Sequence, residues 1–202
     1  MRCPSCLTVL QGAVEACPDC GFTLATLDKK FGTVPKNFRS LTDYSGLYTG
    51  SEQNLLEKKL IEAERFFPGL YLSVMSMEVH PSFKPREYLF WLVNRCHFSP
   101  METRMERNFS VVLFFDSASR TVLLTTGYGL EKALPEDKLQ VILNAALPDF
   151  HHEHFYRGTI GILQEVRRHL KIYCSTGYPA EAPELKTAVQ LGHEAKTQED
   201  LF

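Results

Sequence analysis

Four of the six cysteines stand in two close pairs near the start of this 202-residue chain. The segments "MRCPSC" and "ACPDC" place Cys3 with Cys6 and Cys17 with Cys20, and two residues separate the members of each pair. Two thiolates at this spacing can reach one ion from a tight turn, and two such turns supply the four ligands of a tetrahedral zinc site. The spacing therefore predicts one structural Zn²⁺ held by these four cysteines.

The residues around the two pairs also favour a metal over a redox dithiol or a disulfide, the two alternatives for such cysteines. Pro4 and Pro18 stiffen the turns, and Gly21 lets the backbone come close to the second pair. The ten residues between the pairs carry too few apolar side chains to fold without a cross-link or a metal. The pattern resembles the short zinc-ribbon family, although Leu7 stands where the first turn usually has a glycine. Four protein ligands close the coordination, so we expect no catalysis at this metal.

Charge and hydropathy limit the function classes. The net charge of -2 and the pI of about 6.4 exclude an overall positive field that would draw the chain to nucleic acid or to an anionic membrane. The first 30 residues carry charges that cancel, so protein contact is favoured over nucleic-acid binding through the ribbon. No signal-like segment and no run of about 18 apolar residues occurs. We predict a soluble, cytoplasmic protein with no membrane span.

Hydrophobic periodicity predicts the elements that must position any site. Thr49 and Glu52 have the spacing of a capping box and begin a helix that ends at Pro68-Gly69. The remaining pattern predicts strands at 70–79, 109–116 and 120–127, and helices at 85–98, 135–147 and 154–170. This order indicates an α/β fold, a three-layer sandwich with a mixed sheet between helices. We expect a zinc ribbon at 1–27, a linker at 28–40, one domain at 41–172, and an acidic tail at 173–202 that could hold one short helix.

The segment "NFSVVLFFDSASRTVLLTTGYGLEKAL" resembles the TPM domain, in which a strand, a turn and a second strand lead to a closing pair of helices. The matching positions are Asn108, Arg120, Gly127, Gly129, Leu130 and Glu131, with Asp43, Gly46 and Leu47 upstream and the segment 156–161 downstream. The resemblance covers 41–172. It departs from the family before Asn108, where "VNRCHFSPMETRMERN" replaces the usual glycine-rich loop.

The resemblance implies a three-layer α/β fold and, in several members, binding of a divalent cation such as Ca²⁺. One plant branch of the family has been linked to acid phosphatase activity and photosystem repair. From the residues alone, Asp43, Asp116 and Glu131 offer the oxygen ligands that a hard cation prefers. The alternative is structural, because Asp116 fits a turn, and Asp43 and Glu131 fit helix caps.

Three other features could carry chemistry, and each has a simpler interpretation. The cluster His151, His152, Glu153 and His154 falls between two predicted helices and is interpreted as a solvated loop or helix start. Cys96 and His97 adjoin only in sequence, and we expect Cys96 to be buried. The pair of glycines at 127 and 129 predicts a turn, because it lacks the full dinucleotide-binding pattern.

These observations favour a non-enzymatic protein-interaction or assembly module with a protein partner. A divalent-metal-dependent, phosphatase-like hydrolase acting through acidic residues near Asp43 and Glu131 is the first alternative. Nucleic-acid binding through the ribbon is the second alternative, and the missing basic face weakens it.

Overall fold

A computed structural model describes residues 2–11, 14–33, 38–96 and 108–175. Most of the segment that departs from the TPM pattern, together with His97, lies outside the described residues. The predicted short helix of the acidic tail also falls outside them. No helix in the described ranges has the length and apolar character needed to cross a membrane.

The sheet has four strands in the order β1-β2-β3-β4: β1 (Leu41–Asp43), β2 (Tyr71–Met77), β3 (Ser110–Asp116) and β4 (Thr121–Thr126). The first three strands run parallel, and β4 pairs antiparallel with β3. The predicted mixed sheet and the hairpin of β3 with β4 are confirmed. Periodicity did not predict β1, because three residues are too few to establish an alternating pattern.

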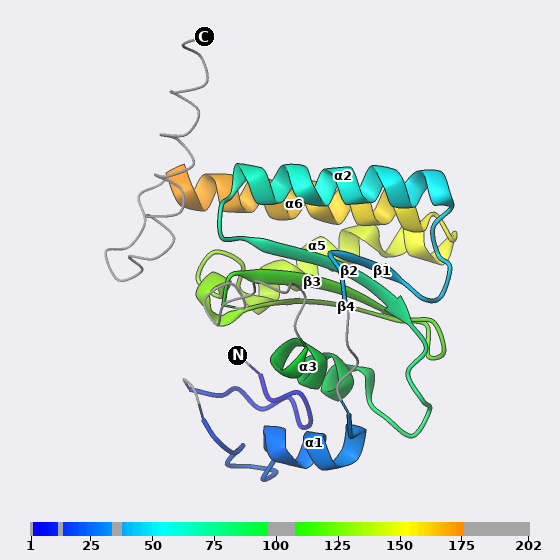
Figure 1. Cartoon of the computed structure of the whole chain (residues 1–202). Coiled ribbons are helices and arrows are strands. Elements are labelled where there is room, and N and C mark those ends of the chain that lie inside the picture. The colour runs from blue at the N-terminus through cyan, green and yellow to red at the C-terminus, as the bar shows by residue number, and fades with distance from the viewer. Residues whose placement is uncertain (1, 12–13, 34–37, 97–107, 176–202) are drawn as a thin grey trace.

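Helices cover both faces of the sheet (Figure 1). The helices α2 (Gly50–Phe66), α5 (Glu136–His151) and α6 (Phe155–Ser175) lie on one face. On the other face lies α3 (Pro85–Arg95), with α1 (Leu24–Phe31) packed outside it. The predicted sandwich of a mixed sheet between helices is therefore confirmed, and α1 with the N-terminal segment adds a further layer beyond α3.

The central strand β3 divides the core into two clusters. Its side chains at Val111, Leu113 and Phe115 join the cluster beneath α2, α5 and α6. Val112 and Phe114 face the other way and join the cluster beneath α3. All seven residues of β3 are buried. The nearly continuous apolar run in the sequence thus reflects a strand that is covered on both faces, as predicted.

The start of α2 follows the predicted capping box. The backbone N–H of Thr49 donates to the Glu52 carboxylate at 2.8 Å, and the Glu52 N–H donates to the Thr49 hydroxyl at 3.4 Å. These reciprocal bonds satisfy two donors that a helix start leaves without partners. A cap of this kind needs only neighbouring residues, so the sequence alone was enough to place it.

The helix α1 crosses the position where we expected the linker to begin. It starts after Thr23, whose hydroxyl accepts the Thr26 N–H at 3.1 Å, and it ends at Phe31. Leu27 is almost completely buried against the cluster beneath α3. An isolated helix of eight residues is unstable in water, so tertiary packing holds α1 in place.

Candidate functional site

The two cysteine pairs sit on two turns with the same backbone geometry. The N–H of Leu7 donates to the Cys3 carbonyl, and the N–H of Gly21 donates to the Cys17 carbonyl, both at 2.9 Å. Leu7 and Gly21 also share a φ of 68°, in the left-handed region that favours glycine. The first turn therefore keeps the backbone of a glycine-containing zinc turn although a leucine occupies it.

The four thiol groups meet at one point. All four Sγ atoms lie within 4.8 Å of one another. Cys3 Sγ is 3.7 Å from Cys20 Sγ, and Cys6 Sγ is 3.6 Å from Cys17 Sγ. A tetrahedral zinc with bonds of about 2.3 Å requires sulfur atoms about 3.8 Å apart. The four cysteines therefore have the spacing and the chemistry of a metal site for an ion such as zinc.

Two thiols of the cluster have shifted pKa values. Hydrogen bonding with the side chain and the backbone of Thr8 lowers the pKa of the Cys6 thiol to about 6. The pKa of Cys20 is raised: the backbone of Phe22 lowers it, but burial and the contacts with the other three thiols outweigh that effect.

The segment with the cysteines is docked on the rest of the molecule through α1. Asp28 accepts hydrogen bonds from Trp91 Nε1 at 3.0 Å and from Arg95 Nε at 2.8 Å. The guanidinium of Arg95 holds the pKa of Asp28 below its usual range, and the Trp91 bond acts in the same direction. Lys30 pairs with the buried carboxylate of Glu87 at 2.8 Å. These bonds fix α1 on α3, so the segment that follows the cysteines is attached to the rest of the chain by a specific contact.

An aromatic cluster completes this contact. The ring of Phe31 lies 4.9 Å from that of Phe83 and 5.2 Å from those of Tyr88 and Trp91. The Phe31 ring meets the rings of Phe83 and Tyr88 edge to face, which is a favourable arrangement for aromatic pairs. The single tryptophan of the chain therefore lies at the junction of α1 with α3.

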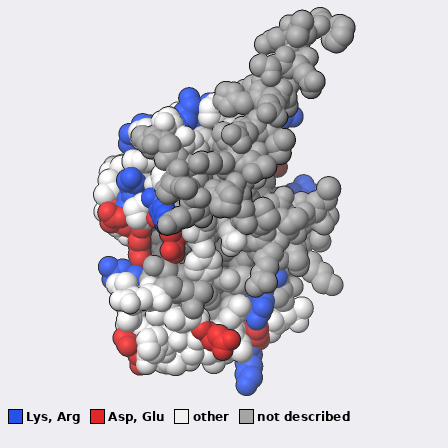
Figure 2. Space-filling model, turned by 90° about the vertical axis from the view of Figure 1, so that its left-hand side faces the viewer, with Lys and Arg blue, Asp and Glu red and all other residues white. Residues whose placement is uncertain are grey.

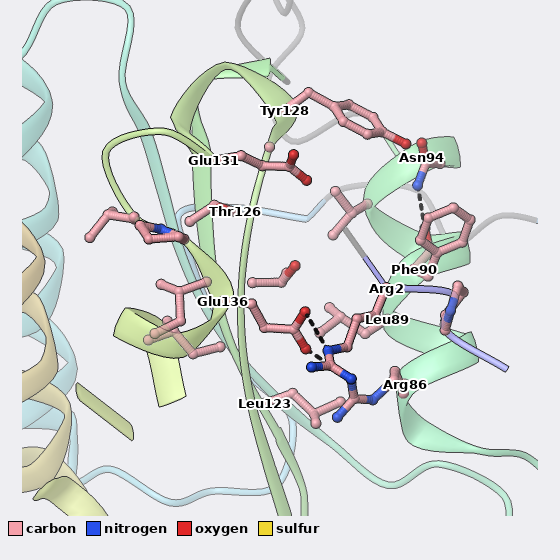
Figure 3. A pocket seen from close by; sticks show the side chains of 18 of the residues that line it. Arg2, Arg86, Leu89, Phe90, Asn94, Leu123, Thr126, Tyr128, Glu131 and Glu136 are labelled. Carbon is pink, nitrogen blue, oxygen red and sulfur yellow. Dashed lines mark hydrogen bonds and ion pairs between the residues drawn. The ribbon is translucent and has the colours of Figure 1, made fainter. Parts of the chain in front are cut away.

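A cavity of about 840 Å³ lies beside β4. Side chains of α3 line one side, side chains of α5 line the other, and the cysteine segment contributes Arg2 and Pro4. At one end Glu136 lies between two guanidinium groups, 3.3 Å from Arg2 Nε and 3.8 Å from Arg86 (Figure 3). Tyr128 and Glu131 lie at the other end. The cavity is thus assembled from parts of the chain that are distant in sequence.

The structure gives Asp43 a full set of internal donors. Its carboxylate accepts the backbone N–H groups of Leu47 and Tyr48 at 3.0 and 3.1 Å. It also accepts the Gln53 amide at 3.2 Å and the Ser76 hydroxyl. Each carboxylate oxygen therefore receives two hydrogen bonds, which use the acceptor sites that a cation would need.

Asp116 and Glu131 occupy two different ends of the sheet. Asp116 ends β3 and is buried, where it accepts the N–H of Val79 at 2.9 Å and that of Ala118 at 3.2 Å. Glu131 follows β4, which runs the opposite way, so it lies at the far end of the sheet and lines the cavity. Within the described ranges, three or more potential metal ligands come together only at the four cysteines, and not at Asp43, Asp116 or Glu131.

The histidine cluster, Cys96 and the two glycines at 127 and 129 have the structural roles that were the simpler interpretation of each. His151 is the last residue of α5, and His152, Glu153 and His154 lie between α5 and α6. All four are exposed, and His152 Nδ1 lies 2.7 Å from the Pro148 carbonyl oxygen. Cys96 is fully buried, as predicted. Gly127 directly precedes a short 3-10 turn, η1 (Tyr128–Leu130), and Gly129 lies within it, so the pair of glycines marks a turn, again as predicted.

Sequence reasoning missed the cavity and the residues that close its charged end. Arg2, Arg86 and Glu136 come from three separate parts of the chain, and none of them stands in a recognisable motif. No local pattern indicates that they meet, because the fold alone brings them together. The sequence shows that Arg2 directly precedes Cys3, but it gives no sign that Arg2 pairs with Glu136.

Comparisons with known proteins found a match to one family's sequence model and two similar solved structures. The N-terminal domain of a P. gingivalis protein has a TM-score of 0.49 and 22% identity, over 68% of this chain and 92% of its own. The N-terminal domain of the Corynebacterium glutamicum protein cg2496 has a TM-score of 0.49 and 11% identity, over 68% and 83%. No curated protein matches. The sequence model of the TPM domain matches residues 99–169, a segment that contains the strand and turn motifs on which the predicted resemblance rests.

Proposed function

We propose that this protein is a non-enzymatic protein-interaction or assembly module in which a zinc-bound ribbon completes a binding cleft on the TPM domain. The observation that carries this proposal is the contact of Arg2 with Glu136 at 3.3 Å across the cavity. Arg2 directly precedes the ligand Cys3 and forms a β-bridge with Val9. Zinc binding would therefore fix Arg2 in the cleft wall.

The lining of the cavity supports binding of a protein segment. Leucine, valine and phenylalanine side chains from α3, β4 and α5 form the apolar part of its walls, polar side chains form the rest, and charged groups stand at its two ends. Binding sites commonly combine an apolar wall with a few polar groups that set orientation. A cleft of this composition suits a bound segment with apolar side chains in its middle and charged side chains at its ends.

The arrangement of the acidic residues supports an interaction module over a hydrolase. Asp43 is used by four internal donors, and Glu131 lies at the opposite end of the sheet. A cation held by both residues would require the sheet to rearrange. We therefore do not assign the phosphatase-like alternative to these residues.

The charges near the ribbon also disfavour nucleic acid as the partner. Lys30 pairs with the buried carboxylate of Glu87, and Arg2 and Arg86 are two separate cations around the carboxylate of Glu136, which is too few for a basic face. On the face shown in Figure 2, acidic and basic side chains stand in small neighbouring groups over the described surface. Phosphate binding depends on a concentration of positive charge, and the described part of this face shows none.

The first test is to count the metal and then locate the partner. Native mass spectrometry of tag-free protein, with and without added Ca²⁺, should find one zinc per chain. Cross-linking mass spectrometry in cells that express the full chain should then place partner cross-links on residues that line the cavity.

The matched variants separate a metal effect from a cysteine effect. The double variant Cys17→Ser, Cys20→Ser should lose the zinc and the partner cross-links, and Arg2→Glu should lose the cross-links while it keeps the zinc. Cys174→Ser, which changes a half-buried cysteine outside the quartet, is the control and should keep both. A set of cross-links that survives loss of zinc would contradict the proposed role of the ribbon.

A further inference from the structure

We propose that the free edge of β4 binds an extended, acidic segment of a partner protein, which joins the sheet as a fifth strand. This inference rests on the proposed interaction function and names its site and the chemistry of its ligand. It depends on three observations: the hydrogen-bonding edge of β4, the apolar walls on its two sides, and the pair of guanidinium groups at one end.

The first observation concerns the backbone of β4. The N–H of Gly127 donates to the Ser110 carbonyl at 2.8 Å, which continues the register that pairs Val111 with Thr126. Hydrogen-bonded and non-hydrogen-bonded pairs alternate along an antiparallel ladder. The N–H and C=O groups of residues 122, 124 and 126 therefore point away from β3. In the part of the chain that the structure describes, β4 has a strand neighbour on one side only.

The second observation is that residues of both helical layers line the cavity beside β4. Leu123 packs with the cluster beneath α3, and Leu124 packs with the cluster beneath α5 and α6. The cavity continues outward between Leu89 of α3 and Leu139 of α5. Successive side chains of a strand point to opposite faces, so an added strand would place alternate side chains against each of these two walls.

The size of the site matches this ligand. β4 is six residues long, and a five-residue strand extends over about 17 Å. The cavity of about 840 Å³ runs along the strand from Val122 to Thr126. An exposed sheet edge binds peptides by main-chain hydrogen bonds, while pockets for alternate side chains give specificity.

The third observation decides the charge of the ligand. Arg2 and Arg86 share a single carboxylate, that of Glu136, at 3.3 and 3.8 Å. Their side chains are about half exposed, at 52% and 46%. Two guanidinium groups with one shared partner leave positive charge at this end, and arginine binds carboxylates through strong, directed hydrogen bonds. An Asp or Glu side chain, or a terminal carboxylate, complements it.

The same charge argues against a second copy of this strand as the occupant. Pairing of β4 with β4 of another chain would place only "TVLLTT" in the site, and this sequence has no acidic residue. Such a dimer would bring four guanidinium groups to the joined edges without an added carboxylate. We therefore assign the site to a partner peptide, and a dimer is an outcome that the test can detect.

The test selects peptides with the full-length, zinc-loaded chain from a displayed library of linear heptapeptides. Fluorescein-labelled copies of the enriched sequences are then measured by fluorescence polarisation. We expect sequences with apolar residues at alternate positions and an Asp or Glu at one end. N-methylation of alternate backbone amides should abolish binding in one register and leave it nearly unchanged in the other, because only one set faces β4.

Variants of the protein test the two halves of the proposal separately. Arg86→Gln should weaken the acidic peptides by roughly tenfold and leave their uncharged analogues unchanged, because it removes a charge-assisted hydrogen bond. Arg157→Gln, on the exposed surface of α6, is the control. Leu124→Pro should abolish binding because it removes an outward N–H. The N-methyl series keeps the proposal testable if that variant does not fold.

Three results would overturn the inference. They are tolerance of N-methylation in both registers, enrichment of peptides without acidic residues, and binding that appears only after residues 176–202 are removed, which would assign the edge to the chain itself. A concentration-dependent dimer lost in Leu124→Pro would also overturn it. If no peptide binds while the partner cross-links persist, the strand-addition site fails and the interaction function survives.

Discussion

Leu7 holds a backbone conformation that its neighbouring turn gives to a glycine. Both residues have a φ of 68°, and Leu7 is 45% exposed, so its side chain gains little from burial. A non-glycine residue in the left-handed region costs on the order of 1 kcal/mol or more. This conformation gives the turn of Cys3 and Cys6 the same shape as the turn of Cys17 and Cys20.

We predict that Leu7→Gly stabilises the zinc-bound ribbon by about 0.5–1 kcal/mol, because relief of strain exceeds the added freedom of the unfolded chain. Competition with a chromophoric chelator should show severalfold tighter zinc binding. Gly21→Ala introduces the same strain at the second turn and should weaken binding. Equal affinities for the wild type and Leu7→Gly would show that the turn carries no strain.

Asp43 shows how a residue that matches a family pattern can have a structural role. Its carboxylate connects the end of β1 to the backbone before α2 and to Ser76 of β2. We predict that Asp43→Ala lowers the free energy of unfolding by about 2 kcal/mol, because it leaves donors without acceptors. Urea unfolding measures this loss. Native mass spectrometry should meanwhile find the same metal count in the variant and the wild type, and a Ca²⁺ lost only in Asp43→Ala would contradict this role.

At the scale of elements, those with a local sequence signal could be predicted, and those that depend on long-range contacts could not. The capping box at Thr49 and the buried run of β3 are continuous in sequence, so they placed α2 and the central strand correctly. The short elements β1 and α1 were missed because each depends on a partner far along the chain. The cavity was missed for the same reason.

The helix α1 gains its stability from α3, and Phe31 is the residue that tests this. Its ring contacts three aromatic rings at the junction. We predict that Phe31→Ala lowers the free energy of unfolding by about 2–3 kcal/mol, through lost burial and aromatic contact. Chemical denaturation followed by Trp91 emission measures it. Val141→Ala, which truncates a side chain 68% exposed on α5, is the matched control and should change stability by less than about 0.5 kcal/mol.

At the scale of the molecule, the N-terminal segment contains two units with different sources of stability. The cysteine turns bury little besides Cys3, Leu10 and Cys17, so a metal must supply most of their stability. The helix α1 joins the large cluster beneath α3 through Leu27. The sequence predicted a metal site because its four cysteines lie within the first 20 residues, but it could not show that the helix after them packs against α3.

This division predicts what a chelator should do to the intact protein. Removal of zinc should expose the amides of Cys3 and Cys17 to hydrogen exchange, because their bonds to the Thr8 and Phe22 carbonyls depend on the metal turns. Trp91 emission should keep its wavelength, because the bond from Trp91 Nε1 to Asp28 involves α1 and α3 and no metal ligand. Exchange and emission can be followed on one sample as the chelator is added. A red shift that accompanies zinc release would show that the metal holds α1 in place as well, and the ribbon and α1 would then form a single unit that docks and undocks with zinc.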